Sequence, residues 1–161
     1  MRFFILICAA ACSVLGAGVT LWGPVESGLQ LGIDVTATSE PAVRVSLTNA
    51  GAEPRDLVVG YEGSVDSFNV QIATGAPGRR QQSVLDVLDL KARPSSLLLP
   101  IVAHLQPGEV REFLYPLSQL ICVVNRKDIP FRALLEQGYW VRASFEFPFT
   151  RLTTPDFSWR Q

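Results

Sequence analysis

In Leu29-Gln30-Leu31-Gly32-Ile33-Asp34-Val35-Thr36-Ala37, apolar residues occupy every second position. Successive side chains of a strand point to opposite faces, so this period of two predicts a strand with one buried face. The pattern recurs near the other end of the chain in Tyr139-Trp140-Val141-Arg142-Ala143-Ser144-Phe145-Glu146-Phe147. Together the two stretches predict an all-β fold.

Shorter apolar stretches, separated by turn residues, predict further strands between these two. They cover residues 43–47, 56–61, 68–72, 97–102, 110–117 and 120–124. Residues 83–91 fit either a strand or a short helix, and residues 129–137 have room for one helical turn that Gly138 ends. About seven to nine short strands without sustained helical periodicity predict an antiparallel β-sandwich.

The N-terminus predicts export. One basic residue, Arg2, precedes an apolar run over residues 3–15, and small residues follow, as in signal peptides. We expect residues 1–17 to be a signal peptide that is cleaved after Ala17, which places the protein in the periplasm or outside the cell.

Two alternatives keep the chain at a membrane. The apolar run becomes a marginal membrane anchor if it extends to Trp22 without cleavage, and Cys12 after three alanines weakly resembles a lipidation site. In each case residues 18–161 have the length of a single domain. Within that domain, the polar, turn-rich residues from Thr74 onward predict a long loop at about 74–96.

Composition and charge exclude one class of partner. The chain has 14 Lys and Arg against 15 Asp and Glu, a net charge of −1, and it has no basic stripe. Since nucleic-acid binding needs clustered positive charge, we expect no nucleic-acid partner. Contact with a membrane is expected only through an uncleaved or lipidated N-terminus.

No group of residues predicts catalysis, a metal site or a cofactor. The only histidine, His104, lies in an apolar context, and a Gly-x-Ser-x-Gly nucleophile motif is absent. Cys122 is the only cysteine after residue 17 and lies in the apolar run Leu120-Ile121-Cys122-Val123-Val124, which predicts a core position. We therefore expect a non-enzyme. An enzyme of unknown class remains the alternative, and it requires His104, Cys122 and a carboxylate to come together.

The candidate contact surface has two parts. Four basic residues lie in the predicted long loop, and loops on a rigid β scaffold often carry binding residues. Two further residues of strand 139–147 point away from its buried face, and exposed Trp and Arg are enriched at binding hot spots. The candidates are Arg79, Arg80, Lys91, Arg93, Trp140 and Arg142. The alternatives are a merely solvated loop, and a C-terminal tail over residues 148–161 that covers Trp140.

Three segments carry a family resemblance. They are Val43-Arg44-Val45-Ser46-Leu47-Thr48-Asn49-Ala50-Gly51, Leu105-Gln106-Pro107-Gly108-Glu109 and Leu135-Glu136-Gln137-Gly138-Tyr139-Trp140-Val141-Arg142-Ala143. They resemble a strand and two turns of immunoglobulin-like β-sandwich domains in bacterial secreted proteins. More distantly, the chain is similar to the immunoglobulin-like domains grouped with a bacterial proteinase-inhibitor family.

The resemblance implies an immunoglobulin-like β-sandwich and no particular chemistry, because such folds serve many functions. We expect an exported, non-catalytic binding module whose partner is a protein or another component of the cell envelope. The resemblance makes a protease inhibitor the first alternative function.

Overall fold

The computed structural model describes residues 19–36, 38–61, 70–78, 85–89, 100–147 and 150–159, and most of this part of the chain is β-strand. The strands are β1 (Leu21–Trp22), β2 (Leu29–Val35), β3 (Ala42–Asn49), β4 (Arg55–Tyr61), β5 (Val70–Gly75), β6 (Leu85–Asp89), β7 (Pro100–Leu105), β8 (Val110–Pro116), β9 (Leu120–Val124), β10 (Lys127–Pro130), β11 (Trp140–Phe147), β12 (Thr150–Thr153) and β13 (Phe157–Ser158). A 3-10 turn, η1 (Leu117–Gln119), and one helix, α1 (Phe131–Glu136), interrupt them. The all-β prediction is confirmed.

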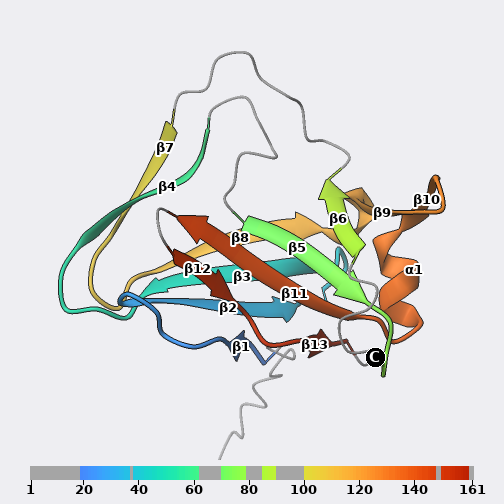
Figure 1. Ribbon diagram of the computed structural model, residues 1–161, viewed down its shortest axis with the longest axis horizontal. Coiled ribbons are helices and arrows are strands. Elements are labelled where there is room, and N and C mark those ends of the chain that lie inside the picture. The colour runs from blue at the N-terminus through green and yellow to red at the C-terminus, as the bar shows by residue number, and fades with distance from the viewer. Residues whose placement is uncertain are drawn as a thin grey trace, which may run out of the picture.

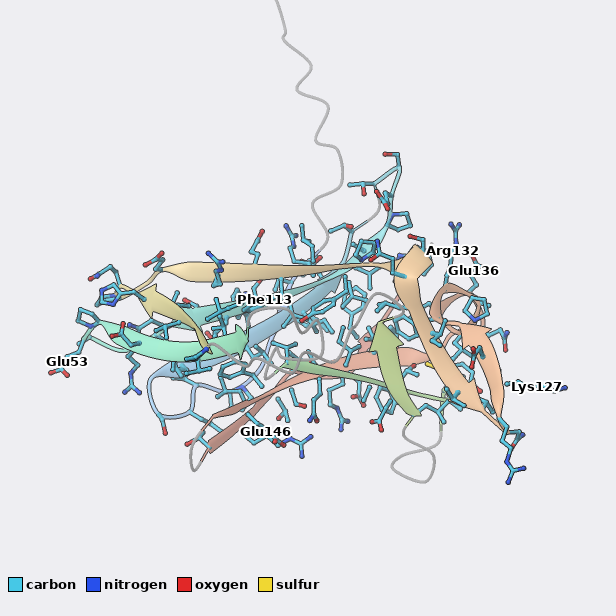
Figure 2. The ribbon with its side chains drawn as sticks, turned by 90° about the horizontal axis from the view of Figure 1, so that it is seen from above. Glu53, Phe113, Lys127, Arg132, Glu136 and Glu146 are labelled. Atoms are coloured by element: carbon cyan, nitrogen blue, oxygen red, sulfur yellow. The ribbon has the colours of Figure 1, made fainter. Side chains whose placement is uncertain are left out.

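The strands form two main sheets and a two-stranded ribbon, and their pairings are antiparallel. The four-stranded sheet has the order β1-β2-β3-β8, and the large sheet has the order β10-β9-β6-β5-β11-β12, with β13 also paired to β11. The remaining pair, β4 and β7, is the ribbon. Figure 1 shows β11 and β5 running obliquely to β2, β3 and β8, and Figure 2 shows the two sheets as separate layers. The fold is therefore sandwich-like.

The core lies between the two layers and follows from the alternation in the sequence. Leu29, Leu31 and Ile33 of β2 are fully buried, and so are Val141 and Phe145 of β11. The ribbon contributes the inward residues of its own strands to the same core, including Leu57, Val59 and Leu105. Burial of apolar surface at about 25 cal/mol per Å² is the dominant favourable term for such a core.

Helix α1 is the helical turn that the sequence predicts. Phe131, Leu134 and Leu135, spaced to share one helix face, are buried against the core. Gly138 ends the helix with φ of +82°, and the amides of Gly138 and Tyr139 donate to the carbonyls of Leu135 and Leu134 at 2.9 and 3.0 Å. This is a Schellman cap, in which the residue after the C-cap Gln137, here Gly138, is left-handed. The cap turns the chain into β11.

Two details differ from the sequence prediction. The described residues contain thirteen strands, more than the expected number, because β1, β10, β12 and β13 have only two to four residues and are too short to show a period. The segment 74–96 is also not one loop, since it contains β6. Leu85 and Val87 of β6 lie opposite Thr74 and Ile72 of β5, so their apolar side chains extend the core face of the large sheet.

The C-terminal tail also differs from its predicted role. Instead of covering the outer face of the large sheet, residues 150–153 and 157–158 pair with β11 as strands at its edge. Leu152 is buried in the core, and Phe157 and Trp159 pack against it. These apolar contacts account for the path of the tail.

Candidate contact surface

The candidate surface is the outer face of the large sheet, opposite the core. Because Val141 and Ala143 point inward, their neighbours Trp140 and Arg142 point outward. The register places Trp140 beside Gly75 and Arg142 beside Ala73 of the adjacent strand β5. Both outward residues are half-buried.

The outward-facing residues on this face continue from β11 and β5 across β6 and β9 to β10, toward the other edge of the large sheet. Ala73 pairs with Asp86 of β6, and Val123 of β9 pairs with Asp128 of β10. Strands β6 and β9 pair through Val87 and Cys122, so Asp86 and Val123 are outward-facing neighbours. We call this set of residues the Trp140 surface: Ala73, Gly75, Asp86, Val123, Asp128, Trp140, Arg142 and Asp156.

The indole of Trp140 packs on the backbone of Gly75. A Cβ atom built on Gly75 would lie 2.3 Å from Cζ2 of Trp140 and 2.6 Å from its Cε2, so the ring lies directly on the glycine backbone. Such a position in a strand often marks the close approach of another group. Any larger side chain at position 75 would displace the indole.

Arg142 covers the indole and is itself held in place. Its guanidinium carbon lies 5.0 Å from the centroid of the Trp140 ring, within the range of a cation–π contact. The Arg142 Nε donates to Oδ1 of Asp156 at 2.7 Å, and its terminal nitrogen lies 2.6 Å from the same oxygen. Gly75, Trp140 and Arg142 thus form a stack, and Asp156 holds Arg142 in it.

The charge of the described surface is acidic. Asp86 and Asp128 are exposed on either side of Val123, a valine that is 46% exposed, and no ion pair within the described residues neutralises them. Arg142 is already neutralised by Asp156. An apolar centre between carboxylates favours a partner that offers cationic and apolar groups.

Of the sequence-predicted candidates, the structure brings Trp140 and Arg142 together. Arg79, Arg80, Lys91 and Arg93 lie outside the described residues. The sequence reasoning missed Gly75 and Asp156, which position the pair. A glycine at the end of an otherwise regular strand was the available signal for Gly75, whereas nothing local marks Asp156 as the partner of Arg142.

His104 and Cys122, which an enzyme would need to bring together, lie in different sheets. Cys122 is fully buried in β9, as predicted, and burial together with the charge of Asp86 raises the pKa of its thiol to about 11. His104 lies on the exposed ribbon, where its Nδ1 contacts the carboxylate of Asp56 and its Nε2 lies 2.8 Å from the Gln106 amide nitrogen. Within the described ranges, no three His, Cys, Asp or Glu residues cluster as metal ligands.

Across the part of the chain that the structure describes, no helix combines the length and hydrophobicity needed to cross a bilayer. No family model matches the chain, and comparison with curated proteins and with solved structures gives no significant match.

Proposed function

We propose that this chain is an exported, non-catalytic binding module of immunoglobulin-like architecture that contacts its partner through the Trp140 surface. The observation that carries the proposal is the stack of Trp140 between Gly75 and Arg142, with Arg142 fixed by Asp156. A binding site gains affinity when its side chains are ordered before the partner arrives, because less conformational entropy is then lost on binding.

The sandwich-like fold and the motifs of the sequence support the architecture. The turn after α1, with Gly138 and Tyr139 leading into β11, corresponds to the segment that resembles immunoglobulin-like domains. Export follows from the signal-like residues 1–17, with the mature chain beginning at Gly18.

The partner that we infer is a protein or another envelope component with basic and apolar groups. The exposed carboxylates of Asp86 and Asp128 attract positive charge, and the apolar Val123 between them can be covered by an aliphatic or aromatic side chain. Trp140 and Arg142 belong to the residue types that carry most of the energy at interfaces.

A photo-crosslinking experiment in the native host tests this proposal. A photoreactive amino acid replaces Gln71, an exposed residue of β5 that lies two residues before Ala73 and therefore faces the same side as the Trp140 surface. The control replaces Ser118, which is exposed in η1 outside the large sheet. We expect an envelope protein to crosslink at position 71 and not at position 118. Equal crosslinking at both positions would refute the assigned face.

Affinity for the crosslinked partner then tests the chemistry of the surface. Asp86→Lys reverses an exposed charge at the centre of the face, and Glu40→Lys makes the same change in the exposed β2–β3 connection of the other sheet. We expect Asp86→Lys to weaken binding at least about tenfold, as for a residue in the centre of an interface. Glu40→Lys should leave the affinity unchanged, and equal effects of the two variants would overturn the proposal.

A further inference from the structure

Strand β8 forms a long open edge of the four-stranded sheet. It is the last strand in the order β1-β2-β3-β8, and no other strand of the described structure pairs with its far side. Its seven residues pair with β3 in an uninterrupted register. The other edges of the two main sheets are shorter, with two residues in β1 and four each in β10 and β12. A regular edge of this length is a template for the addition of another strand.

The backbone groups of β8 alternate between its two sides. Just after its C-terminal end, the amide of Leu117 donates to the carbonyl of Pro41 at 2.9 Å. Because bonded and non-bonded pairs alternate along antiparallel strands, the odd-numbered residues of β8 bond to β3. The backbone groups of Val110, Glu112 and Leu114 therefore point away from β3, toward the open edge. An added antiparallel strand can exchange two hydrogen bonds with each of these residues.

The side chains of the same three residues form an outward row with a charge at its centre. Val110 and Leu114 are 45% and 60% exposed, and Glu112 lies between them with 49% of its side chain exposed. Covering the two aliphatic side chains removes apolar surface from water, so they favour apolar residues on an added strand. The carboxylate of Glu112 favours a cation at the central position.

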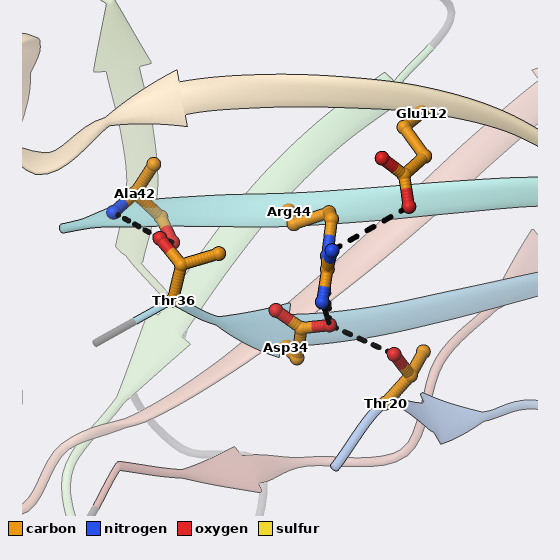
Figure 3. A network of polar contacts seen from close by, with 6 residues as sticks. All are labelled: Thr20, Asp34, Thr36, Ala42, Arg44 and Glu112. Atoms are coloured by element: carbon orange, nitrogen blue, oxygen red, sulfur yellow. Dashed lines mark hydrogen bonds and ion pairs between the residues drawn. The ribbon is translucent and has the colours of Figure 1, made fainter. Parts of the chain in front are cut away.

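Among the described residues, Glu112 has only a shared cation. Figure 3 shows Glu112 reaching from β8 toward Arg44 of β3, at 3.6 Å, which is longer than a hydrogen bond. Arg44 is bound instead to the fully buried Asp34 of β2, whose Oδ2 accepts from Nε and a terminal nitrogen at 3.0 and 2.8 Å. Two carboxylates thus share one guanidinium. A second cation beside Glu112 would balance the charge of this group.

We propose that β8 binds an extended segment of a partner protein, which adds antiparallel to the four-stranded sheet. The segment carries Lys or Arg opposite Glu112, and apolar residues two positions away on either side, opposite Val110 and Leu114. This edge belongs to the other sheet from the Trp140 surface, and the inference does not depend on the proposed function.

A second copy of this chain fits the edge less well than a cationic segment. The self-pairing that uses all three edge-facing residues has its two-fold axis at Glu112, so that Glu112 lies opposite Glu112 of the copy. Like charges directly opposite each other destabilise a sheet. The central carboxylate therefore opposes self-pairing and favours a foreign strand with a basic residue.

A synthetic peptide tests the proposal, with the ¹⁵N-labelled protein observed by NMR. The probe is acetyl-Thr-Val-Thr-Lys-Thr-Val-Thr-amide, whose alternation places Lys opposite Glu112 and Val opposite Val110 and Leu114. We expect saturable shifts of the amide signals of these three residues, with a Kd at or below about 1 mM, and slower hydrogen exchange at the same amides. The absence of shifts at these amides would overturn the proposal.

Two changes to the peptide separate its charge from its backbone pairing. Replacing Lys with Glu reverses the charge, and we expect binding to weaken at least about threefold. N-methylation of the Lys amide removes a hydrogen bond to β8 and should abolish binding. N-methylation of an adjacent Thr, whose amide points to solvent, should leave the affinity nearly unchanged. Equal binding of all four peptides would contradict strand addition.

Charge reversal on the protein provides the complementary test. In Glu112→Lys the preference should invert, with the Glu peptide binding more tightly than the Lys peptide. Glu40→Lys makes the same change in the exposed β2–β3 connection and should keep the preference for Lys. An unchanged preference in Glu112→Lys would refute the pairing opposite Glu112. Concentration-dependent shifts of the edge amides without peptide would assign the edge to a second copy and so overturn the proposal.

Discussion

Within the part of the chain that the structure describes, Asn49→Ala should destabilise the protein more than any other single truncation of a polar side chain that bonds to a turn. Asn49 is the last residue of β3 and is fully buried. Its Nδ2 donates to the carbonyls of Glu53 and Leu105 at 2.7 and 3.0 Å, and its Oδ1 accepts from the amide of Gly51 at 3.0 Å. One side chain thus connects the β3–β4 turn, the ribbon and the four-stranded sheet.

The magnitude follows from these three hydrogen bonds. Each contributes about 0.5–1.5 kcal/mol net, and the partners that remain after truncation are left without a donor or acceptor, so we expect a loss of about 2–4 kcal/mol. Urea denaturation followed by fluorescence measures the free energy of unfolding, with an unchanged slope as the check that the transition stays two-state.

Thr48→Ala is the matched control for Asn49→Ala. Thr48 precedes Asn49 in β3 and also makes a side-chain hydrogen bond to a turn, donating to the carbonyl of Glu109 at 3.1 Å, but in an exposed position. Because water replaces this bond, the expected loss is below about 1 kcal/mol. Equal losses for the two variants would refute the argument that burial makes the hydrogen bonds of Asn49 contribute more to the free energy of unfolding.

The remaining predictions concern strained or closely packed positions. Gly138→Ala should cost about 1 kcal/mol by urea denaturation, because φ is +82° and a Cβ atom would meet nothing within 4 Å, so that only the backbone conformation opposes it. Arg126→Gly should stabilise by about 1 kcal/mol in the same assay, because Arg126 has φ of +62° in the two-residue turn between β9 and β10. Gly75→Val should displace the indole of Trp140, at a cost of about 1–3 kcal/mol, and shift its fluorescence. Cys122, fully buried and with its pKa raised to about 11, should resist alkylation by iodoacetamide at about pH 8 and react once the chain is unfolded in urea.

The sequence predicted those parts of the fold that depend on local periodicity. The stretches 29–37 and 139–147 contain the strands β2 and β11, and Gly138 ends α1 as the pattern indicated. Strands β1 and β13 have two residues each and exist only because they pair with β2 and β11. No window of sequence contains that information, since the pairing partner is distant in the chain.

The same distinction applies to the hydrogen bonds of the turns. The Asn-Ala-Gly sequence at residues 49–51 predicted a turn, and the bond from Gly51 to the Asn49 side chain is the local part of that turn. The bond from Asn49 to Leu105 joins residues 56 positions apart. It depends on how the ribbon packs against β3, which turn propensity does not determine.

In the candidate surface, too, the sequence predicts which side chains point outward, but not which residues from other parts of the chain hold them in place. Alternation alone directs Trp140 and Arg142 outward, but Gly75 reaches them from β5 and Asp156 from the connection between β12 and β13. The Arg142–Asp156 pair is partly exposed, and exposed ion pairs contribute only about 0–1 kcal/mol to folding. Holding Arg142 against the Trp140 ring, however, removes rotamer freedom that a partner would otherwise have to restrict, at about 0.5–1.5 kcal/mol per side chain. We therefore expect this contact to contribute more to binding than to stability, which is the reason for proposing this face of the sheet as the contact surface.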